Sequence, residues 1–140
     1  MTSSPTENAA EAESSPPRAI VAGHAGFAEG LVSAVQQIAG AGHLFTAVSN
    51  SGLGPEDIER SFRDAAAAAD IHVFFTDLPG GSATFAVRRM MRTDSSIVLV
   101  TGTNLAALLE FAFHAELSAR DAAALAAEKG RGALVSHGGT

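Results

Sequence analysis

The chain is predicted to fold as an α/β protein with a doubly wound, mostly parallel sheet. From residue 18 onward, short apolar runs alternate with segments that show helical periodicity. The apolar runs are continuous, as expected for strands that helices cover on both faces. The chain has 140 residues, the size of one domain with a proper core. We therefore predict a single domain over residues 18–140.

Residues 1–17 are predicted to form a disordered tail. They are rich in Ser, Pro, Glu and Ala, and after Met1 they contain no large aliphatic or aromatic side chain. Such a segment cannot offset the entropy that ordering would cost. The tail also carries part of the formal net charge of −6, which leaves the folded part only mildly acidic.

The predicted elements follow one another as a βαβ series. Strands are expected at RAIVA, HLFTAV, IHVFFT and SIVLVT, and helices at FAEGLVSAVQQIA, PEDIERSFRDAAAAA and SATFAVRRMM, with two more helices after the last strand. The first two helices each have an apolar stripe to bury, formed by Phe27, Leu31, Ala34, Val35 and Ile38 in one and by Ile58, Phe62, Ala65 and Ala69 in the other.

Start and stop signals support these helices. Pro55, followed by Glu56 and Asp57, suits a first turn. N-caps are expected at Ser82, at Asn104 or Thr103, and at Ser118 in a capping-box pattern with Asp121. The last helix is expected to stop at Gly130, and the short segment Ala133–Val135 is expected to form one more strand, paired at an edge or with a second subunit.

Two reactive side chains follow predicted strands. His24 comes directly after the first strand and Asp77 directly after the third. In a sheet of order 2-1-3-4, the chain reverses direction between the first and third strands. Such folds bind ligands in the crevice between the carboxyl ends of these two strands. Most other strand orders would separate the two residues. The shared position therefore favours this order and a site at His24 and Asp77 together.

The residue types in this site favour phosphoryl transfer. An imidazole nitrogen can accept a phosphoryl group and later release it. A hydrogen bond from the ring to Asp77 would fix the tautomer and offset the positive charge that develops on the ring. The backbone amides of Gly80, Gly81 and Ser82, at the start of a helix, are expected to bind the phosphoryl oxygens without a metal. We interpret the chain as a phosphohistidine carrier.

Composition excludes several other classes of protein. The sequence contains no cysteine, so thiolate chemistry and disulfides are excluded. With only 9 Lys and Arg, the chain lacks the basic stripe of a nucleic-acid binder. No apolar run is long enough for a membrane span and no secretory signal is visible, so a cytoplasmic protein is predicted. No cofactor is predicted, because neither a phosphate-binding P-loop nor a dinucleotide-binding glycine pattern occurs.

From about Arg18 to Val135, the chain resembles the enzyme IIA component of the mannose family of the bacterial phosphoenolpyruvate:sugar phosphotransferase system. Three segments carry the resemblance: VAGHAGFAEGL, FFTDLPGGSAT and VTGTNLAALLEF. Two departures stand out. Many members read Thr-His-Gly where this chain has Gly23, His24 and Ala25, and many have a proline in the place of Ala83.

The resemblance implies a phosphotransferase component without independent small-molecule turnover. His24 would be phosphorylated, Asp77 would be its hydrogen-bond partner, and histidine-phosphorylated HPr would be the donor. The acceptor would be the IIB component of a sugar permease, which provides the only link to a membrane. Family members are typically homodimers that exchange the final strand, which would account for the segment Ala133–Val135.

Other interpretations of the same fold are weaker. A response-regulator receiver needs an acid pair after the first strand, where this chain has Gly23 and His24, and a flavin binder normally offers Trp or Tyr, which the chain lacks. The phosphocarrier subunit of a dihydroxyacetone kinase and a regulatory module stay open as alternatives.

The remaining histidines, His43, His72, His114 and His137, are interpreted as structural, since no pair has metal-ligand spacing. Arg88 and Arg89 are interpreted as a solvated face, and Met90, Met91, Phe111 and Phe113 as core or interface.

Overall fold

The computed structural model describes residues 15–139. Residues 1–14 of the predicted tail lie outside this range, and the tail stays a prediction. The elements in chain order are β1 (Ala19–Gly23), α2 (Phe27–Ala39), η1 (Gly42–Leu44), β2 (Phe45–Ser49), α3 (Pro55–Ala69), β3 (Val73–Thr76), α4 (Ser82–Met91), β4 (Val98–Val100), α5 (Leu105–Phe113) and α6 (Ala119–Ala133).

The four strands form one parallel sheet of order β2-β1-β3-β4, which confirms the predicted order. β1 lies in the centre and pairs with β2 on one side, where Gly23 is opposite Ser49, and with β3 on the other, where Ala22 is opposite Thr76. All strands therefore end at the same edge of the sheet. His24 and Asp77, each one residue beyond a strand, are both brought to that edge.

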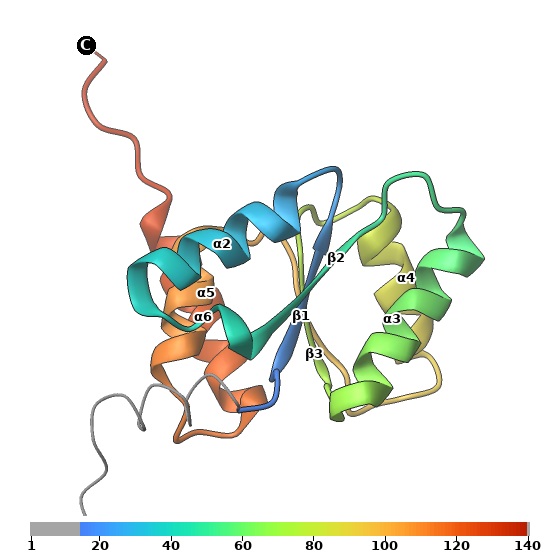
Figure 1. Cartoon of the computed structure of the whole chain (residues 1–140). Helices are drawn as coiled ribbons and strands as arrows, with labels where there is room; N and C mark the ends of the chain where they lie inside the picture. Colours follow the sequence, from blue (N-terminus) through green and yellow to red (C-terminus); the bar gives the residue numbers. More distant parts are fainter. Residues whose placement is uncertain (1–14, 140) are drawn as a thin grey trace, which may run out of the picture.

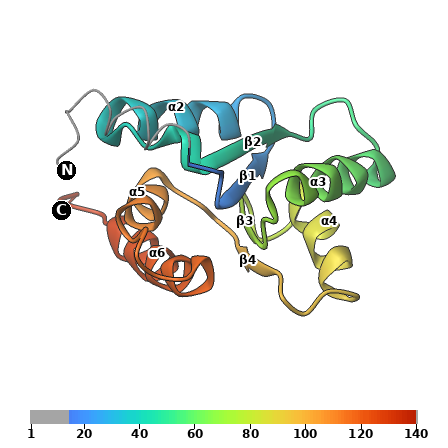
Figure 2. The same ribbon diagram turned by 60° about the horizontal axis from the view of Figure 1, so that its bottom comes forward.

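Helices cover both faces of the sheet, so the fold has three layers, with the sheet in the middle (Figures 1 and 2). Helices α2, α5 and α6 lie on one face, over a core that includes Val21, Phe75 and Phe111. Helices α3 and α4 lie on the other face, over a core that includes Ile20, Phe62 and Phe74. The doubly wound α/β architecture predicted from the continuous apolar runs is thus confirmed.

Several signals for helix starts act as predicted, and one does not. Pro55 occupies the first turn of α3, Asn104 Oδ1 accepts a hydrogen bond from the Ala107 amide at 3.0 Å, and Ser118 Oγ accepts one from the Asp121 amide at 3.1 Å. The cap predicted at Ser82 is wrong, because Ser82 is the first helical residue of α4 and follows Gly81 at φ 96°. The glycine backbone, with no side-chain cap, sets the start of this helix.

The stripe predicted for α2 is wrong at one end. Ala28 and Val35 are buried and Leu31 and Val32 pack against the same core, but Ile38 is 59% exposed. The face of the helix that meets the sheet runs through Ala28, Val32 and Val35, and Ile38 lies to one side of this line in the last turn. Met90 and Phe111 are buried in the core as predicted, whereas Met91 and Phe113 are exposed, so that an interface role for these two stays a prediction.

Gly130 does not end the last helix, which continues to Ala133. It lies where α6 crosses α5, and its carbonyl accepts a hydrogen bond from Asn104 Nδ2 at 2.9 Å. A Cβ at this position would lie 2.9 Å from both Ala107 Cβ and Asn104 Oδ1. The glycine therefore permits close packing of two helices and does not act as a stop signal.

Replacing Gly130 with alanine should lower the free energy of unfolding by about 1–2 kcal/mol. The new methyl group would overpack the contact between α5 and α6, and the higher helix propensity of alanine would offset only part of that cost. Gly132→Ala is the matched control, since a Cβ added there would meet nothing within 4 Å, and it should be neutral or stabilising. Urea unfolding of both variants measures the difference, and equal stabilities would contradict the packing role of Gly130.

The segment Ala133–Val135 forms no strand within the described chain. Ala133 is the last residue of α6, and residues 134–139 contain no regular element. Leu134 is 87% exposed and Val135 is 58% exposed. A segment this short cannot form a stable strand unless it pairs with another strand, so an exchange between subunits stays a prediction.

Candidate active site

The His24 and Asp77 side chains meet at the carboxyl edge of the sheet, which confirms the proximity predicted for them. His24 Nδ1 lies 2.7 Å from Asp77 Oδ2, and the His24 backbone amide donates to the same oxygen at 2.9 Å. The His24 side chain is 55% exposed, whereas the Asp77 side chain is 11% exposed. The imidazole therefore faces solvent while its partner is held beneath it.

Gly23 makes room for this pair. A Cβ on Gly23 would lie 2.8 Å from both Asp77 Cγ and Asp77 Oδ2, and also 2.8 Å from Phe27 Cδ1. The Asp77 carboxylate therefore lies directly over the last residue of β1. In this chain, a side chain at position 23 would therefore have to displace the carboxylate or the Phe27 ring, whereas the family members with threonine here must place these groups differently.

The environment of Asp77 keeps its carboxylate ionised at neutral pH. Partial burial raises the pKa of Asp77, but the hydrogen bonds from the His24 side chain and amide outweigh this effect and hold the pKa below its usual value. An ionised carboxylate only accepts hydrogen bonds, so the proton between the two side chains resides on His24 Nδ1. In the neutral form of the ring, the free lone pair is then on Nε2, which is the atom that can attack an electrophile.

The glycine loop after Asp77 lies against the imidazole. Gly81 has φ 96°, a conformation that suits only glycine, and a Cβ added to it would lie 3.4 Å from His24 Cε1. Gly80 precedes it, and Ser82 begins α4. The amides in the first turn of a helix have no intrahelical partner, and no side chain caps those of α4. The predicted phosphoryl-binding segment Gly80–Ser82 is thus adjacent to the ring.

Sequence reasoning missed Ser51, which supports the turn after His24. Ser51 Oγ accepts a hydrogen bond from the Ala25 amide at 3.0 Å. Ala25 has φ 47°, in the left-handed region that L-residues seldom adopt. The available signal was Ala25 itself, which stands where many members of the family that the sequence resembles have glycine. That signal marks the turn at Ala25, and nothing in the sequence pointed to Ser51 as the side chain that supports it.

Replacing Ala25 with glycine should stabilise the protein by about 0.5 kcal/mol. Glycine removes the cost of the left-handed conformation, roughly 1–2 kcal/mol, and part of that gain is offset by the greater freedom of glycine in the unfolded chain. Thermal and urea unfolding measure the change. A clear loss of stability would show that the turn at Ala25 is not strained.

His43, His72 and His114 lie away from this site. His43 lies in the turn η1, ahead of β2, and His72 lies just before β3, so His72 is not within a strand as predicted. His72 contacts Asp70 and Ser96, and His114, which follows α5, contacts Glu110 and Glu116. These two glutamates raise the pKa of His114 through hydrogen bonds. The structural interpretation of these residues stays a prediction.

Arg89 is only partly on a solvated face, because its side chain is 36% exposed and also bonds to α3. Its Nε donates to Glu59 Oε1 at 3.1 Å, and its Nη2 donates to the Pro55 carbonyl at 3.3 Å. These bonds hold α4 against α3. Arg88, on the same helix, is exposed as predicted.

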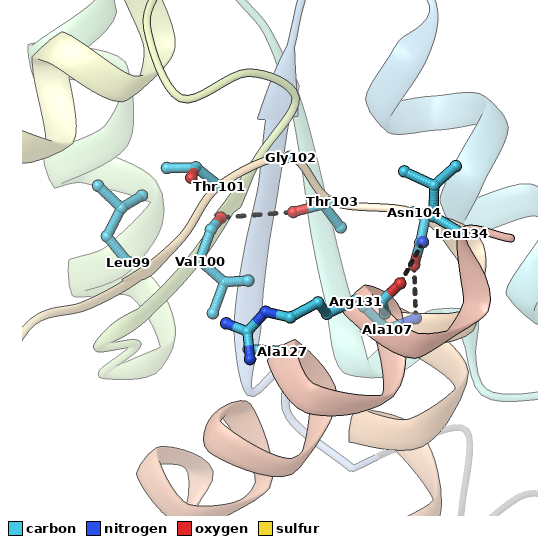
Figure 3. A pocket seen from close by; sticks show the side chains of 11 residues that line it. Leu99, Val100, Thr101, Gly102, Thr103, Asn104, Ala107, Ala127, Arg131 and Leu134 are labelled. Atoms are coloured by element: carbon cyan, nitrogen blue, oxygen red, sulfur yellow. Dashed lines mark hydrogen bonds between the residues drawn. The ribbon is translucent and has the colours of Figure 1, made fainter.

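A pocket of about 430 Å³ lies beyond the carboxyl end of β4, between α5 and the last turns of α6 (Figure 3). Its lining includes Val100, Thr103, Asn104, Arg131 and Leu134, with neither His24 nor Asp77 among the lining residues.

Within residues 15–139, no three His, Asp or Glu side chains are arranged to hold a metal ion. No helix in the same range has both the length and the apolar character needed to cross a bilayer.

Comparison with known proteins identifies the family of the chain. The family model described as PTS system fructose IIA component, EIIA-man, matches residues 18–128. The chain belongs to the EIIA-man family. Membership supports a role as a phosphocarrier component of a sugar phosphotransferase system. Among curated proteins, none matches the chain significantly.

Solved structures share the fold of this EIIA-man chain. The phosphotransferase system component EIIA from Streptococcus agalactiae has a TM-score of 0.76 at 21% identity, over 85% of this chain and 95% of that chain. The mannose/sorbose specific IIA subunit from Enterococcus faecalis has a TM-score of 0.74 at 21% identity, over 90% and 98%. A PTS IIA protein associated with the fucose utilization operon of Streptococcus pneumoniae has a TM-score of 0.66 at 18% identity, over 86% and 93%. At these identities, the likeness shows the fold alone.

Proposed function

We propose that this EIIA-man protein accepts a phosphoryl group from HPr on His24 and passes it to the IIB component of a sugar permease. The observation that carries the proposal is the 2.7 Å contact between His24 Nδ1 and Asp77 Oδ2, together with the exposed ring. This contact commits Nδ1 to a proton and leaves Nε2 free as a nucleophile. The predicted cytoplasmic location stays a prediction.

In the forward step, the lone pair of His24 Nε2 attacks the phosphorus of histidine-phosphorylated HPr. The N–P bond in HPr breaks, its electron pair returns to the imidazole of HPr, and a new N–P bond forms at His24. The His24 ring becomes positively charged in this step because Nδ1 keeps its proton. The Asp77 carboxylate offsets that charge through the existing hydrogen bond. Attack by the IIB component on the same phosphorus completes the relay and restores the neutral ring.

The segment Gly80–Ser82 is proposed to bind the phosphoryl oxygens during both steps. Its amides lie at the start of α4, where the helix dipole favours a negative charge. Gly81 lies against the ring, so a group on His24 would be close to these amides. Binding by amides alone leaves the phosphoryl group transferable, because neutral amides hold it less tightly than a lysine or a metal ion would.

Apolar side chains near His24 support a role in which other proteins dock there. Leu53, Leu78 and Phe85 are 41%, 52% and 52% exposed. They come from the loop after β2, the loop after β3 and the first turn of α4, all at the carboxyl edge of the sheet. Apolar groups exposed around a reactive side chain are typical of a surface that binds proteins.

Phosphopeptide mapping tests the proposed function. The protein is incubated with phosphoenolpyruvate, enzyme I and HPr, and the acid-labile phosphate is located by mass spectrometry. We expect the label on His24 in the parent and no label in His24→Gln. Label on His43, His72, His114 or His137, or no label at all, would overturn the assignment. Adding either a IIB component or the kinase subunits that act on dihydroxyacetone then identifies the acceptor.

We also propose that the protein is a homodimer in which Leu134 and Val135 pair with β4 of a second copy. β4 is an edge strand, so its outer backbone groups can pair with another strand. The pocket in Figure 3 lies beside this edge, and both apolar side chains of the segment are exposed. Burial of these side chains against a second copy would stabilise the pair.

Light scattering after size-exclusion chromatography tests the dimer. The molar mass of the parent protein should correspond to two chains. The Leu134→Asp variant should have a molar mass closer to that of one chain. Ile38→Asp, at an exposed position on α2, is the matched control and should remain dimeric. A parent protein that is monomeric at micromolar concentration would overturn the proposal.

A further inference from the structure

Two buried hydroxyl groups lie beneath the loop that contains the proposed phosphoryl-binding glycines. Thr76 is the last residue of β3 and Thr84 lies in the first turn of α4, and neither is exposed. Their Oγ1 atoms are 2.7 Å apart. Thr84 Oγ1 also donates to the carbonyl oxygen of Leu78 at 2.5 Å. The site described above does not use these groups.

The direction of these hydrogen bonds follows from the number of protons. Each hydroxyl has one proton to donate. Thr84 donates its proton to the Leu78 carbonyl, so the bond between the two hydroxyls must use the proton of Thr76. The result is a directed chain from Thr76 O–H to Thr84 O–H to the Leu78 carbonyl. Hydrogen bonds in such a chain strengthen one another, and burial keeps water from competing with them.

This chain attaches to the segment that links Asp77 to the glycine pair. Leu78 directly follows Asp77, and its side chain is 52% exposed, so packing of that side chain contributes little to holding the loop. At the other end of the loop, the Phe85 amide donates to the Gly81 carbonyl at 3.0 Å, as part of α4. The loop is therefore held at Leu78 by Thr84 and at Gly81 by the helix.

We infer that Thr84, supported by Thr76, is a positioning residue that fixes the direction of the Gly80–Ser82 amides toward a phosphoryl group on His24. The inference rests on the proposed function and adds residues to it. Loss of the Thr84 hydroxyl would release the Leu78 carbonyl and allow the loop to shift. Amides that are misplaced by even a small distance stabilise a transferring phosphoryl group less well.

The test compares three variants in the HPr transfer assay, with rates expressed per folded protein. Thr84→Val keeps the volume of the side chain but removes the hydroxyl, and we expect transfer to slow about 10-fold. Thr84→Ser keeps the hydroxyl and should transfer within about 2-fold of the parent. Thr76→Val leaves the bond from Thr84 to Leu78 in place, so its loss should be smaller than that of Thr84→Val. The ³¹P chemical shift of phosphorylated His24 should change in Thr84→Val and not in Thr84→Ser.

Thr93→Val is the matched control, because Thr93 Oγ1 also donates to a backbone carbonyl, that of Met90, at the far end of α4. Its transfer rate should equal that of the parent. If Thr84→Val loses stability but transfers at the parental rate per folded molecule, the hydroxyl is only structural and the inference is overturned. The same assay separates the two proposals. A parent labelled on His24 with unaffected Thr84→Val overturns this inference alone, whereas an unlabelled parent overturns both.

Discussion

Replacing Asp77 with alanine should slow phosphoryl transfer to His24 by roughly 10- to 100-fold, the range found when carboxylates that hydrogen-bond metal-ligating histidines are removed. The carboxylate makes two contributions that the variant loses. It fixes the proton on Nδ1, and it offsets the charge that the ring gains when Nε2 is phosphorylated. The folded state should lose only about 1 kcal/mol, because the contact involves a half-exposed ring.

Asp77→Asn separates the two contributions. An amide oxygen can still accept hydrogen bonds from the His24 amide and Nδ1, so the ring keeps its orientation, but the neutral group cannot offset the developing charge. We expect a rate between those of the parent and Asp77→Ala. The rates are measured by rapid quench with phosphorylated HPr. Rates equal to that of the parent in both variants would show that the carboxylate has no part in the transfer.

The same contact predicts a dependence of stability on pH. Because the pKa of Asp77 is lower in the folded protein than its ordinary value of 3.8, the folded state is favoured by ionisation of this group. That stabilisation is complete above the unfolded pKa and is lost as the pH falls through the folded pKa. The stability difference between the parent and Asp77→Ala should therefore shrink below about pH 4, as urea unfolding at a series of pH values would show.

Much of the fold could be predicted from local sequence patterns, and the structure has the helices where these patterns place them. The segments FAEGLVSAVQQIA, PEDIERSFRDAAAAA and SATFAVRRMM form α2, α3 and α4 over the predicted residues. The meeting of His24 and Asp77 also followed from the sequence, because parallel strands in the order observed bring their carboxyl ends to one edge. These features depend on periodicity, which a sequence displays directly, and on a strand order that the positions of His24 and Asp77 favoured.

The features that sequence reasoning missed depend on contacts between residues far apart in the chain. Gly130 looks like a helix stop until α5 is seen to pack against it, and Arg89 looks solvated until Glu59 is placed beside it. Ser51 and Thr84 carry no pattern at all, since a short hydroxyl side chain is common in loops and first turns. Their roles become visible only when the backbone groups that they bond are located.

Replacing Gly23 with alanine should damage the site as severely as the loss of Asp77 itself. The added Cβ would lie 2.8 Å from the carboxylate and from the Phe27 ring, so both groups must shift and the contact between the carboxylate and His24 is disturbed. We expect transfer to fall by roughly 10- to 100-fold, as for Asp77→Ala. The free energy of unfolding should also fall by about 1–3 kcal/mol, the usual cost of overpacking.

A double-mutant cycle shows whether the two substitutions act through the same contact. If Gly23→Ala acts by displacing the carboxylate, it should slow transfer little further in a protein that already carries Asp77→Ala, because coupled residues are not additive. Gly30→Ala is the matched control in α2, where an added Cβ would meet nothing within 4 Å, and it should transfer at the parental rate. Additive losses in the double variant would mean that Gly23 affects the nucleophile by another route, such as a shift of the His24 backbone. Parental transfer by Gly23→Ala would instead show that the carboxylate can yield to a methyl group without releasing the ring.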